Sequence, residues 1–191
     1  LAVDSTLKYA KSLPFIRKEE SMAGYFNHPI RVADYSIRSV NPPNLDILHL
    51  GLMHNVYEVS GLNEHQIKKQ GYSSDVALGI RLMTIDRHLQ EDVDYLMEYY
   101  GAIENYSKEL AVLKCFDKLD NMLAFELIED NDEKFNYIEL ANQFVLPITK
   151  RLSTQFGAFC ADLISYIKKA GCRYDLREKY LNFINEHKEI N

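Results

Sequence analysis

Apolar residues recur at three- and four-residue spacing along most of the chain, which is the pattern of helices that bury one face. The segment opened by His28-Pro29 keeps this spacing through Val40, and Pro29 suits the first position of a helix whose mouth would carry His28. Eight glycines and five prolines leave few turn-forming residues, which favours long helices over the short turns of a sandwich or barrel. We therefore predict an all-α fold, a bundle of roughly eight to ten helices.

Breaks in the apolar spacing set the bounds of the expected helices. Pro14, the pair Pro42-Pro43 and several glycines interrupt the pattern, and a residue that precedes proline is disfavoured in the helical region. The stretch 17–24 is polar and is expected to lie outside the helices. The expected helices cover residues 4–11, 29–40, 45–59, 64–70, 74–83, 86–100, 107–127, 133–156, 159–170 and 174–189.

Composition argues against several classes of protein. The net charge is −6, which disfavours a broad electrostatic contact with DNA or RNA, although a local basic pocket is compatible with it. The apolar stretch 47–53 is far shorter than the ~20 residues of a membrane span. Three cysteines without CxxC spacing suggest neither a disulfide framework nor a zinc knuckle, so we expect a cytoplasmic protein.

Several histidines and acids have spacings that suit metal chemistry. His54 and Glu58 stand four residues apart, which would place them on one face of a helix, and Asp117 and Asn121 repeat that spacing. A divalent metal that hydrolyses phosphate esters needs a few nitrogen and oxygen ligands, an open position for water and a carboxylate that takes a proton. His28, His54 and Asp117 are candidate ligands on three expected helices, and Glu58 is a candidate proton acceptor.

Several of these residues also have a simpler interpretation. The stretch 117–120 fits a solvated helix face, and the lysines at 18, 114 and 118 fit a solvated surface. Tyr99-Tyr100 fits either a base-stacking pair or one flank of a helix. A helical nucleic-acid-binding protein is a weaker alternative, because aromatic residues at helical spacing favour core packing. The remaining histidines are expected to be hydrogen-bonded in the core or exposed: His49, His65, His88 and His187.

Three segments carry a resemblance to a known family. They are YFNHPIRVA at 25–33, LHLGLMHNVYEVSGL at 48–62 and VLKCFDKLDNM at 112–122. Together they resemble the HD-superfamily metal-dependent phosphohydrolases, most of all the alarmone (ppGpp) hydrolase branch of SpoT type, with its HP…VA, LLHDxxEDTG and VKLADxLxN patterns. The similarity covers about residues 5 to 155 in the expected order and spacing.

The resemblance implies a metal centre in an all-helical domain. In such proteins the residues that match His28, His54, Asn55 and Asp117 surround one divalent ion, typically manganese. The residue that matches Glu58 is the first acid of a Glu-Asp pair, which helps to orient and deprotonate the attacking water. These roles are therefore expected for the five residues of this chain.

The resemblance also implies a pocket for a phosphorylated ligand. Arg17, eleven residues before His28, matches an arginine beside the catalytic pocket, and Asn121 matches an asparagine that lines the nucleotide pocket. Lys18 and Lys118, with Lys114, are expected to help Arg17 neutralise phosphates. The expected ligand is a small phosphorylated nucleotide, ppGpp-like, or a related phosphate ester. No membrane and no nucleic-acid polymer is expected as a partner, and a homo-oligomer stays an option.

Two residues depart from the family pattern. Asn55 stands where the family has the Asp of its His-Asp doublet, and Val59 stands where it has the second acid of the Glu-Asp pair. A neutral amide leaves only one negative charge to hold the metal, so metal affinity should fall. Val59 cannot accept a proton, so Glu58 would act alone.

Three explanations of these departures stay open. The chain is a natural enzyme with an altered site, a natural pseudoenzyme that binds a nucleotide or a protein partner without cleaving it, or a form inactivated on purpose by exchange of Asp for Asn at position 55. The extent of the resemblance places an HD-type domain at residues 1–155. Residues 156–191 are expected to form a C-terminal helical extension packed on the same domain.

Overall fold

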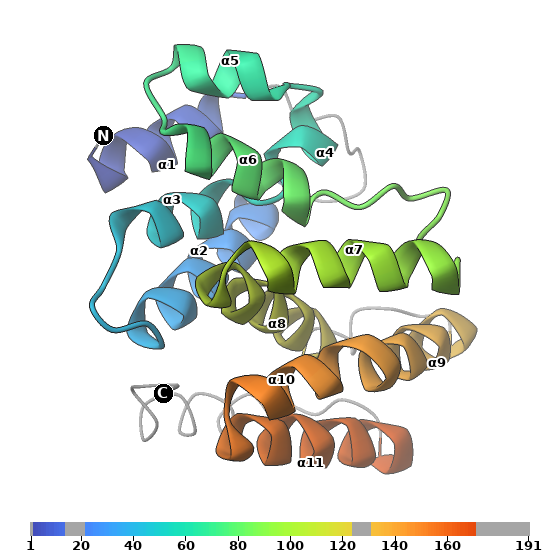
Figure 1. Cartoon of the computed structure of the whole chain (residues 1–191). Helices are drawn as coiled ribbons and strands as arrows, with labels where there is room; N and C mark the ends of the chain where they lie inside the picture. Colours follow the sequence, from blue (N-terminus) through green and yellow to red (C-terminus); the bar gives the residue numbers. More distant parts are fainter. Residues whose placement is uncertain (1, 14–21, 124–130, 171–191) are drawn as a thin grey trace.

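The computed structural model of the chain is all-helical, and it describes residues 2–13, 22–123 and 131–170 (Figure 1). These residues contain no strand, which confirms the predicted all-α fold class. The elements in chain order are α1 (Val3–Ser12), α2 (Met22–Arg38), α3 (Leu45–Met53), α4 (Val56–Ser60), α5 (Glu64–Lys69), α6 (Ser74–Met83), α7 (Val93–Tyr106), α8 (Lys108–Leu123), α9 (Asn131–Leu140), the π-helical segment η2 (Ala141–Val145), α10 (Leu146–Leu152) and α11 (Thr154–Ala170).

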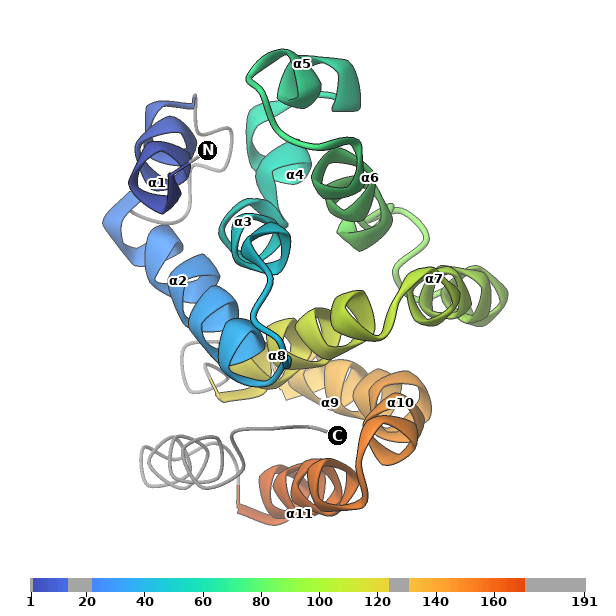
Figure 2. The same cartoon turned by 60° about the vertical axis from the view of Figure 1, so that its left-hand side comes forward.

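Helices α2, α3 and α8 form the centre of the bundle (Figure 2). Helix α2 packs along both of the others, and α8 is buried on nearly all sides. The approach of α2 and α3 is close because Gly51 has no side chain: a Cβ atom there would lie 2.5 Å from Ala33 Cα. The three polypeptide segments that carry the candidate ligands are therefore held together by the core itself.

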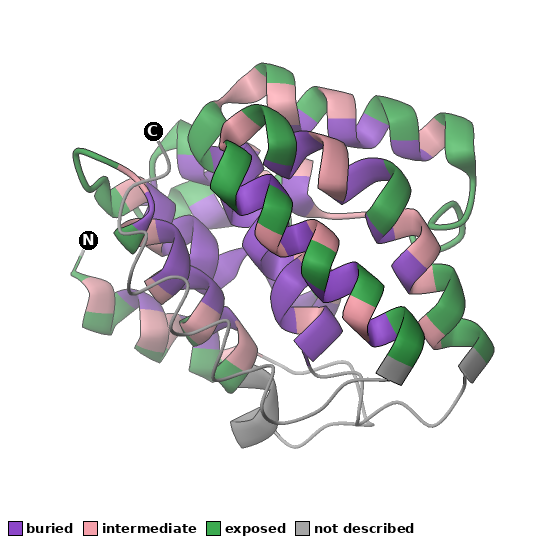
Figure 3. Cartoon of the chain, turned by 90° about the horizontal axis from the view of Figure 1, so that it is seen from below, coloured by how far each residue is buried: buried purple, intermediate pink, exposed green. Residues whose placement is uncertain are grey.

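The remaining helices cover this centre on both sides. Helices α1, α4, α5 and α6 lie on one side of it, and α9, α10 and α11 lie on the other (Figure 1). Buried residues face inward, whereas the outer faces of the peripheral helices are exposed (Figure 3). Several helices begin at a side chain that accepts a hydrogen bond from the first turn: Asn44, Asn63, Ser73 and Asp92.

The start of α2 differs from the prediction. The helix begins at Met22, so residues 22–24 of the polar stretch are helical and His28 lies inside the helix instead of at its mouth. Pro29 is therefore an interior residue, and it removes one backbone hydrogen bond from α2. Its side chain is buried, which helps to offset that loss. Residues 14–21, which include Arg17 and Lys18, lie outside the described residues.

Further helices were expected with wrong bounds. The helix expected over 133–156 ends at Leu152, and the next begins at Thr154 instead of at 159. The helix expected over 45–59 is divided into α3 and α4, because the backbone turns at Asn55, where φ is −98° and ψ is 3°. The amphipathic stretch expected from residue 86 becomes helical only at Val93, where Asp92 caps α7. Residues 84–92 form the loop that joins α6 to α7.

The C-terminal part of the described chain is built into the core. Segments α9, η2 and α10 follow one another without a break, and α11 packs against α10. Phe156 near the start of α11 is fully buried, and its ring lies 5.1 Å from that of Phe116 in α8. The expected boundary after residue 155 thus falls inside α11. The helix expected at 174–189 lies outside the described residues.

Candidate metal centre

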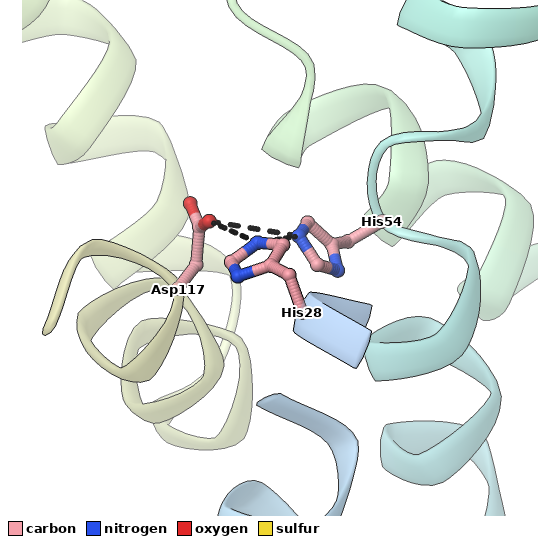
Figure 4. Close-up of side chains that lie close together, drawn as sticks. All are labelled: His28, His54 and Asp117. Carbon is pink, nitrogen blue, oxygen red and sulfur yellow. Dashed lines mark hydrogen bonds and ion pairs between the residues drawn. The ribbon is translucent and has the colours of Figure 1, made fainter. Parts of the chain in front are cut away.

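His28, His54 and Asp117 converge from three helices on one point (Figure 4). His28 comes from the middle of α2, His54 follows the last residue of α3, and Asp117 lies on α8. His28 Nε2 lies 3.2 Å from His54 Nε2 and 3.2 Å from Asp117 Oδ1, and His54 Nε2 lies 3.5 Å from the same oxygen. The sequence-based prediction that these three residues meet is therefore correct.

The turn that follows α3 and a hydrogen bond to α3 fix the orientation of the His54 ring. His54 is fully buried, and its Nδ1 lies 2.7 Å from the carbonyl oxygen of Gly51, one turn earlier in α3. A carbonyl oxygen only accepts, so Nδ1 carries the proton and donates it. The lone pair of Nε2 is then free to face His28 and Asp117, as a metal ligand must.

A second carboxylate, that of Asp120, contacts the His28 ring at Nδ1, the nitrogen that does not face His54 and Asp117. His28 Nδ1 lies 2.8 Å from Asp120 Oδ2, and Arg31 donates to both oxygens of Asp120 at 2.7 and 2.8 Å. Asp120 is 1% exposed. Because Nδ1 points at a carboxylate, Nε2 is the ring nitrogen that faces His54 and Asp117.

Asp117 is held as a carboxylate by its neighbours. Lys114 Nζ lies 3.0 Å from Asp117 Oδ2, and Asn121 Nδ2 donates to Oδ1 at 3.2 Å. Burial alone would raise the pKa of Asp117, but the Lys114 charge and hydrogen bonds from His28 and His54 hold it well below its usual range. The group is ionised at neutral pH, which is the form that binds a cation.

The same charges favour a proton on His28 in the metal-free protein. Burial alone would lower the pKa of His28, but hydrogen bonds to Asp117 and Asp120, together with their charges, raise it to about 9. The second proton then lies on Nε2, between Asp117 Oδ1 and His54 Nε2. A proton and a metal ion therefore compete for one place.

The distances fit a single first-row cation. Ligand atoms about 2.1 Å from one ion stand about 3.0 Å apart at a right angle and about 3.4 Å apart at the tetrahedral angle. Two of the observed separations, both 3.2 Å, lie within this range, and the third, 3.5 Å, lies just above it. Two imidazole nitrogens and one carboxylate oxygen leave further coordination positions open. Such donors suit manganese, iron or zinc, so the geometry does not choose among them.

Asn55 and Glu58 lie next to this group in the sequence but on a separate element. Asn55 precedes α4, its side chain makes no capping hydrogen bond, and it is partly exposed. Glu58 lies in α4, so the expectation that His54 and Glu58 share one helix is wrong. The side chain of Glu58 is 11% exposed, and its Oε2 accepts from Arg87 Nη2 at 2.7 Å and Nε at 3.2 Å.

The lysine and asparagine candidates take different positions. Asn121 lies beside the centre, where its amide donates a hydrogen bond to Asp117. Lys118 is partly buried, with its Nζ 5.1 Å from the centre of the Tyr137 ring. Lys114 is buried and also donates to the carbonyl of Met83 at 3.3 Å, so for this residue the interpretation as a solvated surface lysine is wrong.

Sequence reasoning missed the polar groups behind the ligands. Asp120, Arg31 and Arg87 were not singled out, and the interpretation of 117–120 as a solvated helix face is wrong, because Asp117 and Asp120 are both buried. A helix that is buried on nearly all sides has no polar face, so periodicity gives no signal there. The sequence shows only that oppositely charged residues stand at positions 31 and 120. That Arg31 and Asp120 form an ion pair becomes visible only in the folded structure.

The simpler interpretation holds for other candidates. His49 is buried with its Nδ1 2.9 Å from Thr6 Oγ1, and His65 and His88 are exposed, as expected. His187 lies outside the described residues. Tyr99 and Tyr100 are 8% and 7% exposed, so the base-stacking interpretation is wrong and the pair belongs to the core flank of α7.

Comparison with models of known protein families and with curated proteins gave no match. Among the described helices, none combines the length and the apolar run that crossing a bilayer requires. The function therefore has to be argued from the residues of the centre.

Proposed function

We propose that the protein is a metal-dependent phosphohydrolase that acts on a small phosphorylated nucleotide of ppGpp type or on a related phosphate ester. The convergence of His28, His54 and Asp117 is the observation that carries this proposal. The order and spacing of the three motifs that resemble the HD superfamily support it. We further propose Mn²⁺ as the metal and Asn55 as an additional neutral ligand, since an amide oxygen suits a divalent ion.

The charges around the centre favour a negatively charged ligand. Each of three carboxylates has a cation beside it: Asp117 pairs with Lys114, Asp120 with Arg31, and Glu58 with Arg87. These six groups sum to no net charge. A divalent cation would then leave an uncompensated positive charge in a partly buried place, and a phosphate group is a natural partner for it.

The residues divide the work of hydrolysis. A bound divalent cation would act as a Lewis acid toward a phosphoryl oxygen and make water more acidic. Water adds to phosphorus as the bond to the leaving oxygen breaks; one proton passes to Glu58, and the leaving oxygen takes a proton from solvent. Arg17 is proposed to stabilise the developing charge. Lys18, Lys118 and Asn121 are proposed to bind the nucleotide.

A binding module is the second candidate. It is favoured by the single ionised ligand, since Asn55 and Val59 both lack the charge that the resembled family has there. The Oε2 atom of Glu58 is also already occupied by two hydrogen bonds from Arg87. In this alternative the same centre holds a nucleotide or engages a protein partner without turnover. A chain altered on purpose at position 55 would behave in the same way.

Phosphate and pyrophosphate release from ppGpp and from a panel of nucleotides, measured with and without Mn²⁺, tests the proposal. We expect release that depends on Mn²⁺, that is lost in His54→Gln and that is kept in the control His65→Gln, since His65 is an exposed histidine of α5. Calorimetry with the same nucleotides separates the two candidates. Binding without release at saturating Mn²⁺ would favour the binding module, and the absence of both would contradict both candidates.

A further inference from the structure

Asp120 is a buried carboxylate beside the centre that accepts several hydrogen bonds, although it does not face the candidate ligand atoms. Its Oδ2 accepts from His28 Nδ1 at 2.8 Å and from Arg31 Nη2 at 2.8 Å, and its Oδ1 accepts from Arg31 Nε at 2.7 Å. The side chain of Asp120 is 1% exposed and that of Arg31 is 27% exposed. Three donors from α2 therefore fix the plane of one buried carboxylate on α8.

We propose that Asp120, clamped by Arg31, is a positioning residue that orients His28 as a metal ligand. The proposal rests on the metal centre of the proposed function and does not depend on hydrolysis. Asp120 accepts a hydrogen bond from the protonated Nδ1 of His28, which leaves Nε2 as the nitrogen that would bind the cation. The forked contact with Arg31 stops the carboxylate from rotating away from the ring.

The positions in the fold explain why this clamp is needed. His54 is oriented by its own helix, through the carbonyl of Gly51. The equivalent contact for His28 comes instead from α8, across the interface between helices, so a side chain has to supply it. Asp117 and Asp120 stand three residues apart on α8 and thus occupy neighbouring positions on the helix. One helix therefore provides both a ligand and the group that aims another ligand.

A purely structural role makes a different prediction. Arg31 and Asp120 join α2 to α8, so their loss would lower the stability of the fold whatever happens at the centre. A positioning role predicts, in addition, a loss of metal affinity. This loss should be larger than in a variant that is destabilised to the same extent far from the centre. Metal affinity and thermal unfolding have to be measured on the same variants.

The first experiment measures Mn²⁺ binding to the full chain by titration calorimetry, without nucleotide. We expect Asp120→Asn to weaken binding 10- to 100-fold, the range found for such supporting groups. Arg31→Lys, which keeps the charge but loses the fork, should give a smaller loss that is still more than twofold. Ile103→Val, in the core of α7, is the matched control: it lowers stability and should leave Mn²⁺ affinity unchanged.

The second experiment reads the protonation of His28 directly. In the Zn²⁺-loaded chain, which is diamagnetic, histidine ¹⁵N spectra should show a protonated Nδ1 and a metal-bound Nε2 for His28. In Asp120→Asn the Nδ1 resonance should lose the shift that a carboxylate acceptor causes. If Asp120→Asn does not fold, Arg31→Lys provides the same two measurements.

Two results would overturn the proposal. The first is Mn²⁺ affinity within twofold of wild type in a folded Asp120→Asn or Arg31→Lys chain. The second is an equal loss of affinity in Ile103→Val, which would assign the effect to stability. A wild-type chain that binds Mn²⁺ but releases no phosphate would contradict the proposed hydrolysis and leave the clamp intact. A wild-type chain that binds no divalent cation would contradict both.

Discussion

Position 55 is where we expect the exchange of one atom, nitrogen for oxygen, to change the affinity of the centre for a cation. The amide of Asn55 follows the ligand His54 directly and is neutral, so Asp117 is the one carboxylate in the proposed ligand set. Asn55→Asp replaces the amide by a carboxylate of nearly the same size and shape, and it adds a negative charge. We expect Mn²⁺ affinity to rise about tenfold or more, measured by titration calorimetry, because an ionised oxygen is the stronger ligand.

Asn105→Asp on α7 is the control for Asn55→Asp. Asn105 is exposed, whereas Asn55 is partly exposed, and it gains the same charge on a helix that provides no candidate ligand. Its Mn²⁺ affinity should stay at the wild-type value. Equal affinities in all three proteins would show that residue 55 does not contact the cation.

Position 59 behaves differently, although it departs from the same family pattern. Val59 is 5% exposed and packs in the hydrophobic core. An acid there would have to bury a charge or take up a proton, and we expect Val59→Asp to lower the free energy of unfolding by about 3 kcal/mol or more. Urea unfolding measures this. Val59→Ala, which removes volume without adding a polar group, should cost less, and a Val59→Asp chain as stable as wild type would contradict the buried placement.

The convergence of the three candidate ligands could be predicted from sequence, whereas the groups behind them could not. His28, His54 and Asp117 stand in motifs whose order and spacing leave few alternatives. Asp120 lies in the same motif as Asp117, but its partner Arg31 is 89 residues away in the chain and on another helix. The acidic stretch therefore looks like a solvated surface until the packing of α2 on α8 is known.

The packing of α2 on α3 sets the distance between two candidate ligands. His28 belongs to α2 and His54 follows α3, and these helices approach closely at Gly51. Gly51→Ala would bring a Cβ atom to 2.5 Å from Ala33 Cα, which is backbone and cannot move aside. The helices must separate, so we expect a loss of about 2 kcal/mol in the free energy of unfolding together with weaker Mn²⁺ binding.

Gly101 offers a matched control in a helix of the same fold. A Cβ atom added there would meet nothing within 4 Å. Gly101→Ala in α7 should therefore raise the free energy of unfolding by about 0.5–1 kcal/mol, since glycine is a poor helix former, and leave Mn²⁺ binding unchanged. Urea unfolding and calorimetry of the two variants compare them directly. A Gly51→Ala chain as stable as Gly101→Ala would contradict the close approach of α2 and α3.

Most element positions could be read from the sequence, and the exceptions have physical reasons. Gly71, with φ at 90°, follows α5 as glycine signals predict, and Ser73 caps α6. The division after α3 carries no such signal, because His54 and Asn55 replace the glycine or proline that marks most helix ends. Pro29 gives a misleading signal: it suits a first helical position, yet burial in the bundle keeps it inside α2.

Across the whole centre, the balance of paired charges predicts that cation and anion bind together. Because three carboxylates already have basic partners, the charge of Mn²⁺ is best matched by a ligand from solution. We expect saturating inorganic phosphate to raise Mn²⁺ affinity about tenfold, and Mn²⁺ to raise phosphate affinity by the same factor. Calorimetry in both directions measures this coupling. Chloride at equal ionic strength is the control, and equal Mn²⁺ affinity with and without phosphate would contradict the charge argument.

The competition between a proton and the cation for the centre gives a pH dependence with a definite sign. In the metal-free protein the pKa of His28 is raised from 6.5 to about 9, so at neutral pH each Mn²⁺ that binds must displace a proton. Apparent Mn²⁺ affinity should rise about tenfold per pH unit from pH 7 toward 9 and level off above it. Calorimetry in buffers of different ionisation enthalpy should count one proton released at pH 7.

The same raised pKa acts in the opposite direction on the stability of the metal-free fold. Protonated His28 is bound by Asp117 and Asp120 in the folded chain only, so its contribution is complete below pH 6.5 and is lost as the pH rises through 9. Loss of the His28 proton should therefore make the metal-free protein less stable at pH 9 than at pH 6.5. Mn²⁺, in contrast, should stabilise the fold most at the higher pH. If proton and cation share one position, the unfolding temperature should fall with rising pH in the metal-free protein and rise with pH in the Mn²⁺-bound protein. Thermal unfolding at several pH values measures the two slopes. Parallel slopes would mean that the two bind in different places.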